Sequence, residues 1–228
     1  LCKAAHCAIS IVHPSSSEAL EAARQARQAG VDITIETCPH YLTHDINWEN
    51  GEVGKINPPL RQESDREALW KGIADGLIDT VASDHVHRGI SGKDGGIWKA
   101  SPGCPGLETL LPVMLSEGHI NRGIPLSQIV SLLCEGPARA MGLWGRKGGL
   151  LPGFDADIAI VDLRRGRTLS RSDVLSDAGY SIYEGTELKG LVTRTLVRGV
   201  QVFADGKVIS ETAGHGRYQR RSLKADRG

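Results

Sequence analysis

The sequence has no excess of charge of either sign. Its 228 residues include 27 basic and 27 acidic side chains, which gives a formal net charge of zero. A surface that binds nucleic acid or an anionic membrane usually carries an excess of lysine and arginine. We therefore expect no nucleic-acid or membrane partner, and a small neutral or mildly charged ligand instead.

The sequence also lacks cysteine-pair motifs and long apolar runs. Its five cysteines are scattered and contain no C-x-x-C pair, which argues against a disulfide framework or a zinc knuckle and favours a reducing compartment. No apolar run approaches the ~20 residues that span a bilayer, and no basic-then-apolar leader opens the chain. We therefore expect a soluble, cytoplasmic protein.

What is present predicts alternating strands and helices. Residues 8–12 and 31–36 are strand-like, and between them lies a helix that Ser17 can cap and Gly30 can close. This spacing predicts a βαβ unit of a parallel sheet. A third strand is predicted at 80–82, a long functional loop at 89–106, and helices at 64–75, 107–117, 127–135 and 137–143.

The composition changes near Gly148. Residues 1–147 have the α/β pattern, whereas 148–228 hold short alternating β segments joined by glycine and aspartate turns, so we expect a separate small β domain. A basic stretch at 214–228 is expected to be a partly disordered tail. The opening LCKAAHC has no initiator methionine and looks like the end of a helix, so we expect a fragment.

Titratable side chains follow each of the three predicted strands. His13 follows the first, Glu36 and His40 lie at the second, and Asp84, His85 and His87 end the third. Carboxyl ends of parallel strands share one edge of a barrel or sheet, so these groups should face a common mouth. Imidazoles and a carboxylate that converge there can bind zinc or a similar divalent ion, although a single histidine after a strand is more often a capping group. We expect Glu36 and Cys38 to be buried strand-end residues.

A series of motifs then resembles a known family, the cyclic amidohydrolases, which include dihydroorotase, hydantoinase, dihydropyrimidinase and allantoinase. The resemblance covers nearly the whole chain in the right order. It rests on IVHPSS, ETCPHYL, KINPPLR, DTVASDH, SPGCPGLETLLP, GPARAMGL, KGGLLPGFDADIAIVD and YEGTELKG.

The resemblance implies the later part of a TIM-type (β/α)8 metal-dependent hydrolase barrel, strands six to eight, followed by part of a small β-sandwich. It implies zinc-dependent hydrolysis of a cyclic amide or ureide, with two zinc ions in the intact parent and a hydroxide, activated by the metal, that attacks the ring carbonyl. His13 and Asp84 would be metal ligands, and Asp84 also the general base and acid. Asn57, Pro102 and Gly103 would bind the substrate ring. A homo-oligomer is expected.

The chain also departs from the family pattern. The paired histidines, the bridging carboxylated lysine or acid and an earlier histidine all precede its first residue, so this piece alone should be inactive. Where the dihydroorotase form has D-H-x-P-H, this chain has a displaced His87 followed by Arg88, which could clamp a substrate carboxylate. Gly136 stands where an asparagine usually begins a helix, so we expect a lost helix cap.

Three interpretations remain open at this point. The first is a zinc-dependent hydrolase of a dihydroorotate-like, hydantoin-like or allantoin-like ring. The second is a non-catalytic relative that keeps the barrel for assembly and has lost its metal. The third is a deacetylase with a single metal ion, which the NPPLR and PGCPGLE segments disfavour.

Overall fold

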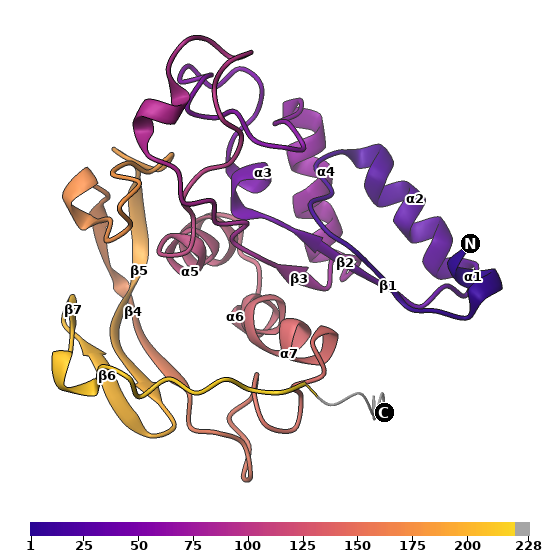
Figure 1. Cartoon of the computed structure of the whole chain (residues 1–228). Coiled ribbons are helices and arrows are strands. Elements are labelled where there is room, and N and C mark those ends of the chain that lie inside the picture. Colours follow the sequence, from indigo (N-terminus) through magenta and orange to yellow (C-terminus); the bar gives the residue numbers. More distant parts are fainter. Residues whose placement is uncertain (222–228) are drawn as a thin grey trace.

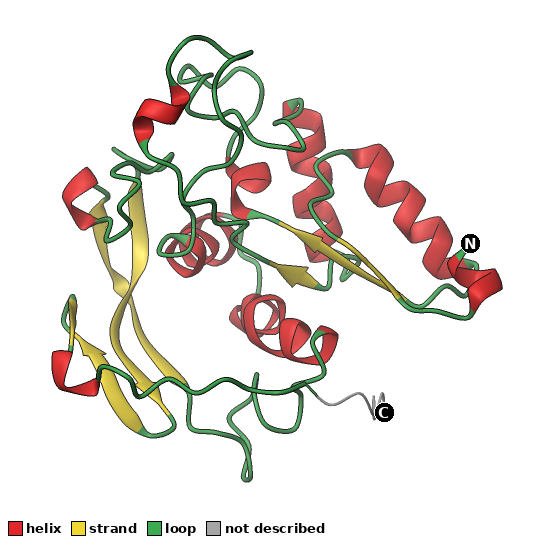
Figure 2. Cartoon of the chain, viewed as in Figure 1, coloured by secondary structure: helices red, strands yellow, loops and turns green. Residues whose placement is uncertain are grey.

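The protein contains two sheets with helices between and around them (Figures 1 and 2). The structure is a computed structural model that describes residues 1–221, so the predicted tail at 214–228 lies partly outside the described residues. The first sheet is parallel, and the second is antiparallel, in the orders β1-β2-β3 and β4-β5-β6-β7. The strands are β1 (Ile9–Ile11), β2 (Ile33–Thr37), β3 (Thr80–Val81), β4 (Ile158–Thr168), β5 (Glu187–Val197), β6 (Val200–Ala204) and β7 (Lys207–Val208). The predicted α/β class is confirmed.

Helices connect the strands of the first sheet, as the spacing predicts. α2 (Ser17–Gln28) lies between β1 and β2, and α3 (Pro39–Thr43) and α4 (Glu63–Ala74) lie between β2 and β3, whereas α1 (Cys2–Ala5) precedes β1. The cap of α2 is one residue earlier than predicted, because the hydroxyl of Ser16 accepts the Ala19 N–H at 3.2 Å. Ser17 instead donates its N–H and its hydroxyl to the carboxylate of Asp65, at 2.8 and 2.9 Å, which ties the start of α2 to the start of α4. Gly30 follows the helix with a φ of 82°, as the closing glycine should.

Two helices follow the long loop, and each contains a π-helical part. α5 (Leu110–Val113) runs directly into η2 (Met114–Asn121), and α6 (Leu126–Val130) continues through η3 (Ser131–Glu135) into α7 (Gly136–Ala140). The predicted break before Pro137 is therefore absent. Short 3-10 turns complete the described elements: η1 (Ile90–Lys93), η4 (Arg171–Asp173) and η5 (Ser210–Thr212).

Gly136 has a packing role where a lost cap was expected. It lies inside the continuous helix, where no cap is needed. A Cβ at this position would lie 2.2 Å from the carbonyl oxygen of Asp79, just before β3. The expectation of a lost cap is wrong, because the helix backbone lies so close to the strand that only glycine fits.

One apolar core extends from the parallel sheet to β5. Ile35 of β2, Met114 of η2 and Leu188 of β5 belong to the same cluster of buried side chains. α5 and η2 contact β5, while η3 and α7 contact β3, so these helices fill the space between the sheets (Figure 1). The predicted boundary at 147/148 falls between α7 and β4 and stays a prediction. Over residues 1–221, no helix has the length and apolar character needed to cross a membrane.

Candidate functional site

The ends of β1 and β3 bring two of the predicted residues into contact. His13 lies two residues after β1 and Asp84 three residues after β3. Both have a left-handed backbone, with φ of 62° and 45°, a conformation that is uncommon outside glycine and often marks functional sites. Nε2 of His13 lies 3.3 Å from Oδ1 of Asp84, with 27% and 22% of the side chains exposed. The two groups therefore meet across the end of the central strand β2 and remain accessible.

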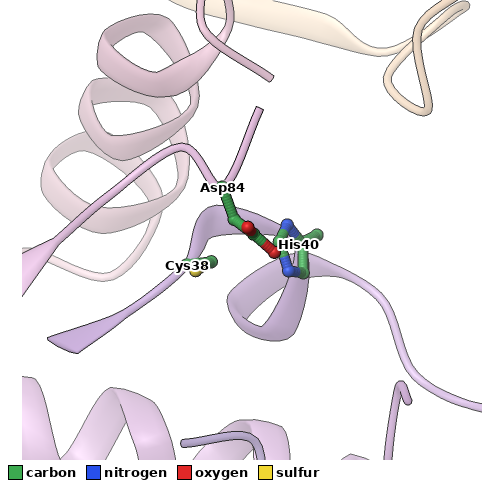
Figure 3. Close-up of side chains that lie close together, drawn as sticks. All are labelled: Cys38, His40 and Asp84. Atoms are coloured by element: carbon green, nitrogen blue, oxygen red, sulfur yellow. The ribbon is translucent and has the colours of Figure 1, made fainter. Parts of the chain in front are cut away.

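The end of β2 supplies two further ligand types. Cys38 follows the strand and His40 lies in α3, and their Sγ and ring nitrogen come within 4.8 Å of each other and of an Asp84 oxygen. Figure 3 shows the Asp84 carboxylate pointing toward the His40 ring, with Cys38 beside them. We call Glu36, Cys38 and His40, with His13 and Asp84, the strand-end site.

Burial keeps the His40 ring neutral. The side chain is 2% exposed, and its buried Nε2 has no hydrogen-bond partner among the residues that the structure describes. Burial, and then the neighbouring His44 and His13, lower the pKa of His40 to about 3. A neutral imidazole with an unused buried nitrogen is the form that binds a metal.

The two carboxyl groups of the strand-end site have pKa values that are raised, whereas that of His40 is lowered. Burial raises the pKa of Asp84, and His13 partly offsets the rise. Burial also raises the pKa of Glu36, and the Asp84 charge adds to the rise. His13 and a 3.4 Å hydrogen bond from the Thr80 hydroxyl act in the opposite direction and lower this pKa. Partly buried carboxyls with raised pKa values are suited to general acid and base chemistry.

The residues present fit a divalent transition metal in donor type. Imidazole nitrogen, carboxylate oxygen and thiolate are the three ligand types of protein zinc. Cys38 would have to lose its proton on metal binding, because burial and then the charges of Asp84 and Glu36 raise the pKa of its thiol. Cys38 is 0% exposed, as the sequence predicts. Its place beside Asp84 was missed, since only the fold brings the two together.

His85 forms hydrogen bonds to a neighbouring loop through its ring nitrogen. Its Nδ1 accepts the backbone N–H groups of Gly106 and Leu107, both at 3.2 Å. The neighbouring Val86 donates its N–H to the carbonyl of Cys104 at 2.9 Å. The segment that follows Asp84 therefore holds residues 101–107, which we call the 101–107 loop.

The predicted substrate-binding residues lie around this loop. Gly103 is buried and Pro102 partly buried, whereas Asn57, His87 and Arg88 are exposed. Nη1 of Arg88 lies 3.4 Å from the Ser101 hydroxyl. Within residues 1–221, no hydrogen bond or ion pair joins Asn57, His87 or Arg88 to His13 or Asp84. The structure thus brings the two predicted metal ligands together, whereas three of the predicted substrate-binding residues, Asn57, His87 and Arg88, form no contact of this kind with them.

Comparisons with known proteins agree on one group of enzymes. The model of the amidohydrolase family matches residues 3–202. The chain is 37% identical over 218 residues to a D-phenylhydantoinase of Escherichia coli, covering 92% of this chain and 47% of that protein. It is 38% identical over 217 residues to an allantoinase of Rubrobacter xylanophilus, covering 94% of this chain and 48% of that protein.

Solved structures give the same result. The crystal structure of dihydropyrimidinase from Brevibacillus agri matches with a TM-score of 0.90 at 31% identity, over 97% of this chain and 50% of that one. An L-hydantoinase (dihydropyrimidinase) from Arthrobacter aurescens matches with a TM-score of 0.87 at 35% identity, over 91% and 47%. The chain spans about half the length of these relatives. Because the family model covers most of its length, the chain belongs to the amidohydrolase family.

Proposed function

We propose that the complete protein is a metal-dependent hydrolase that opens the ring C–N bond of a cyclic amide or ureide. The observation that carries the proposal is the 3.3 Å approach of His13 and Asp84 at the ends of parallel strands, in a chain of the amidohydrolase family. The relatives named above act on hydantoin-, dihydropyrimidine- or allantoin-type rings by their names, which favours these ring classes. The dihydroorotate-like ring stays a prediction.

His13 and Asp84 would hold the metal, which we propose is zinc. They are only two ligands, and we propose that the rest of the complete protein supplies the others, including a bridging carboxylated lysine or acid. A zinc ion bound there would supply Lewis acidity that activates water and polarises the ring carbonyl. The alternative set of Cys38, His40 and Asp84 is less suited to catalysis, because Cys38 and His40 are almost fully buried and a catalytic metal needs a position open to water.

Asp84 would carry the proton. Its carboxylate is half-buried and its pKa is raised, so it can take a proton from the attacking water and later give it to the ring nitrogen as the C–N bond breaks. Asn57 and the backbone at Pro102 and Gly103 would orient the ring. Arg88 and His87 would contact a polar substituent of the substrate, since both are exposed beside the 101–107 loop.

The likeness to these relatives supports a proposal for the fold of the complete protein. The three parallel strands with α2 and α4 would be the last strands and helices of a TIM-type barrel, and β4–β7 would be part of a β-sandwich. Residues 1–147 and 148–228 would then be the two domain portions. Cytoplasmic location and a homo-oligomer stay predictions.

Replacement of the proposed proton carrier tests the function. In the complete protein, Asp84→Asn should lower kcat by at least 100-fold on the best of four probes: hydantoin, dihydrouracil, allantoin and dihydroorotate. Asp94→Asn is the matched control, because Asp94 is exposed on a nearby loop. Turnover of Asp84→Asn within tenfold of the wild type would remove Asp84 from this role. Metal analysis of the wild type separates the scaffold alternative, which predicts no bound zinc and no turnover of any probe.

A further inference from the structure

Lys93 is a buried lysine with which no carboxylate of residues 1–221 forms an ion pair. It is 2% exposed, although lysine is almost never fully buried without a partner. Its Nζ donates to three backbone carbonyls, those of Lys55, Ser101 and Gly103, at 3.0, 2.9 and 2.6 Å. These three bonds use every donor of the ammonium group.

The three carbonyls belong to the two segments that carry the proposed ring-binding groups. Lys55 lies two residues before Asn57, and Ser101 and Gly103 flank Pro102. The Gly103 N–H also donates to the Lys55 carbonyl at 2.9 Å, so the segments are joined directly as well as through Lys93. Burial at this point is costly for a charge unless its hydrogen bonds are satisfied, and here the two segments satisfy all of them.

The backbone at Gly103 has little freedom to move. Its φ is +97°, and a Cβ there would lie 2.5 Å from Cγ2 of Val86. The next residue, Cys104, accepts the Val86 N–H, and His85 holds the far end of the 101–107 loop. Val86 and His85 follow Asp84 directly, so one continuous set of contacts runs from Lys93 to the strand-end site.

We propose that Lys93 is a positioning residue that fixes the 101–107 loop and the Lys55–Asn57 segment relative to Asp84, and thereby sets the affinity for the substrate ring. The inference rests on the proposed function. Lys93 contacts neither substrate nor metal, and it acts through the carbonyls that it holds. Its loss should therefore weaken ring binding while metal content stays the same.

The test replaces Lys93 with methionine, an apolar side chain of similar length without donors. Lys99→Met is the matched control, since Lys99 is an exposed lysine in the same loop. In the complete protein, amide hydrogen exchange at Gly103 should be at least tenfold faster in Lys93→Met than in Lys99→Met. KM for the best ring substrate should rise about tenfold, kcat should change less than threefold, and bound zinc should be unchanged.

The outcomes separate the two proposals. Unchanged exchange at Gly103 overturns the role of Lys93. Faster exchange with an unchanged KM also overturns it, because Lys93 would then serve stability alone. If the wild type hydrolyses no ring substrate, the proposed function fails, and the ring-binding part of this inference fails with it. Faster exchange at Gly103 in Lys93→Met would then still support the role of Lys93 in joining the 101–107 loop to the Lys55–Asn57 segment. If Lys93→Met does not fold, Lys93→Gln, which keeps two donors, takes the same measurements, with a smaller change expected.

Discussion

Replacing Gly136 with alanine should destabilise the protein, against the usual effect of this change in a helix. Alanine normally stabilises a helix interior by roughly 0.5–1 kcal/mol relative to glycine. At Gly136 the added Cβ would lie 2.2 Å from the carbonyl oxygen of Asp79 and 3.1 Å from that of Ser131. Ordinary contact begins at 3.4 Å, so α7 or the chain before β3 would have to move by about 1 Å.

Asp79 is poorly placed to move. Its N–H donates to the carbonyl of Ile35 at 2.9 Å, and its carboxylate accepts the Ile35 N–H at 2.7 Å and a bond from Arg27. Overpacking against a fixed neighbour costs typically 1–3 kcal/mol. Subtracting a helix gain of about 0.75 kcal/mol from an overpacking cost of about 2 kcal/mol, the middle of each range, leaves an expected net loss of about 1 kcal/mol. We also expect a displacement of the strand that leads to Asp84.

Chemical denaturation of the complete protein measures this loss as a lower free energy of unfolding for Gly136→Ala. Gly72→Ala in α4 is the matched control, since its Cβ would meet side-chain carbons rather than backbone: a methyl group of Leu20 at 3.2 Å and Ile78 at 3.4 and 3.5 Å. We expect the control to lie within about 1 kcal/mol of the wild type. A Gly136→Ala protein as stable as the wild type, or more stable, would refute the close approach of α7 to β3.

Two further predictions concern stability. Lowering the pH from 6.5 to about 4 should reduce the free energy of unfolding, because burial lowers the pKa of His44 to about 4, so in this window the unfolded state binds a proton that the native state does not. The loss of unfolding free energy is at most about 3 kcal/mol. Urea titrations should show that this free energy depends less on pH in His44→Phe than in the wild type. An equal pH dependence in the two proteins would contradict the prediction. Glu108→Ala should cost about 1 kcal/mol and lower Tm by a few degrees, because its exposed carboxylate accepts the N–H groups of Leu175 and Ser176, both at 2.8 Å, whereas exposed Glu49→Ala should leave Tm unchanged.

The contact between His13 and Asp84 could be predicted because it follows from local signals. Apolar runs locate the strands, and parallel strands end at one edge, so residues just after two of them must be near each other. The sequence does not give the left-handed backbone at both residues, which sets the final direction of each side chain.

The rest of the site depends on packing between distant segments. Lys93 is one of several charged residues in a glycine-rich loop, and only the fold shows that three carbonyls from two segments surround it. His40 could be predicted as a residue near the strand end, but its burial and its unused Nε2 depend on the helices packed over it. The packing role of Gly136 also depends on a distant segment, since its close neighbour Asp79 is 57 residues away in the chain.

The electrostatics of the strand-end site indicate what it is built to receive. Its two carboxyls, Glu36 and Asp84, are half-buried. Burial raises the pKa of both, and the Asp84 charge also raises that of Glu36. Within the described part of the chain, His13 is the one titratable group that lowers either pKa. No lysine or arginine neutralises them there, so burying this much negative charge is unfavourable as the chain stands. A divalent cation would reverse the effect, because a bound ion becomes the largest local charge and lowers the pKa of every ligand that faces it. The same groups that are destabilising alone would then be stabilising, which is the arrangement expected where a metal completes the fold of its own site.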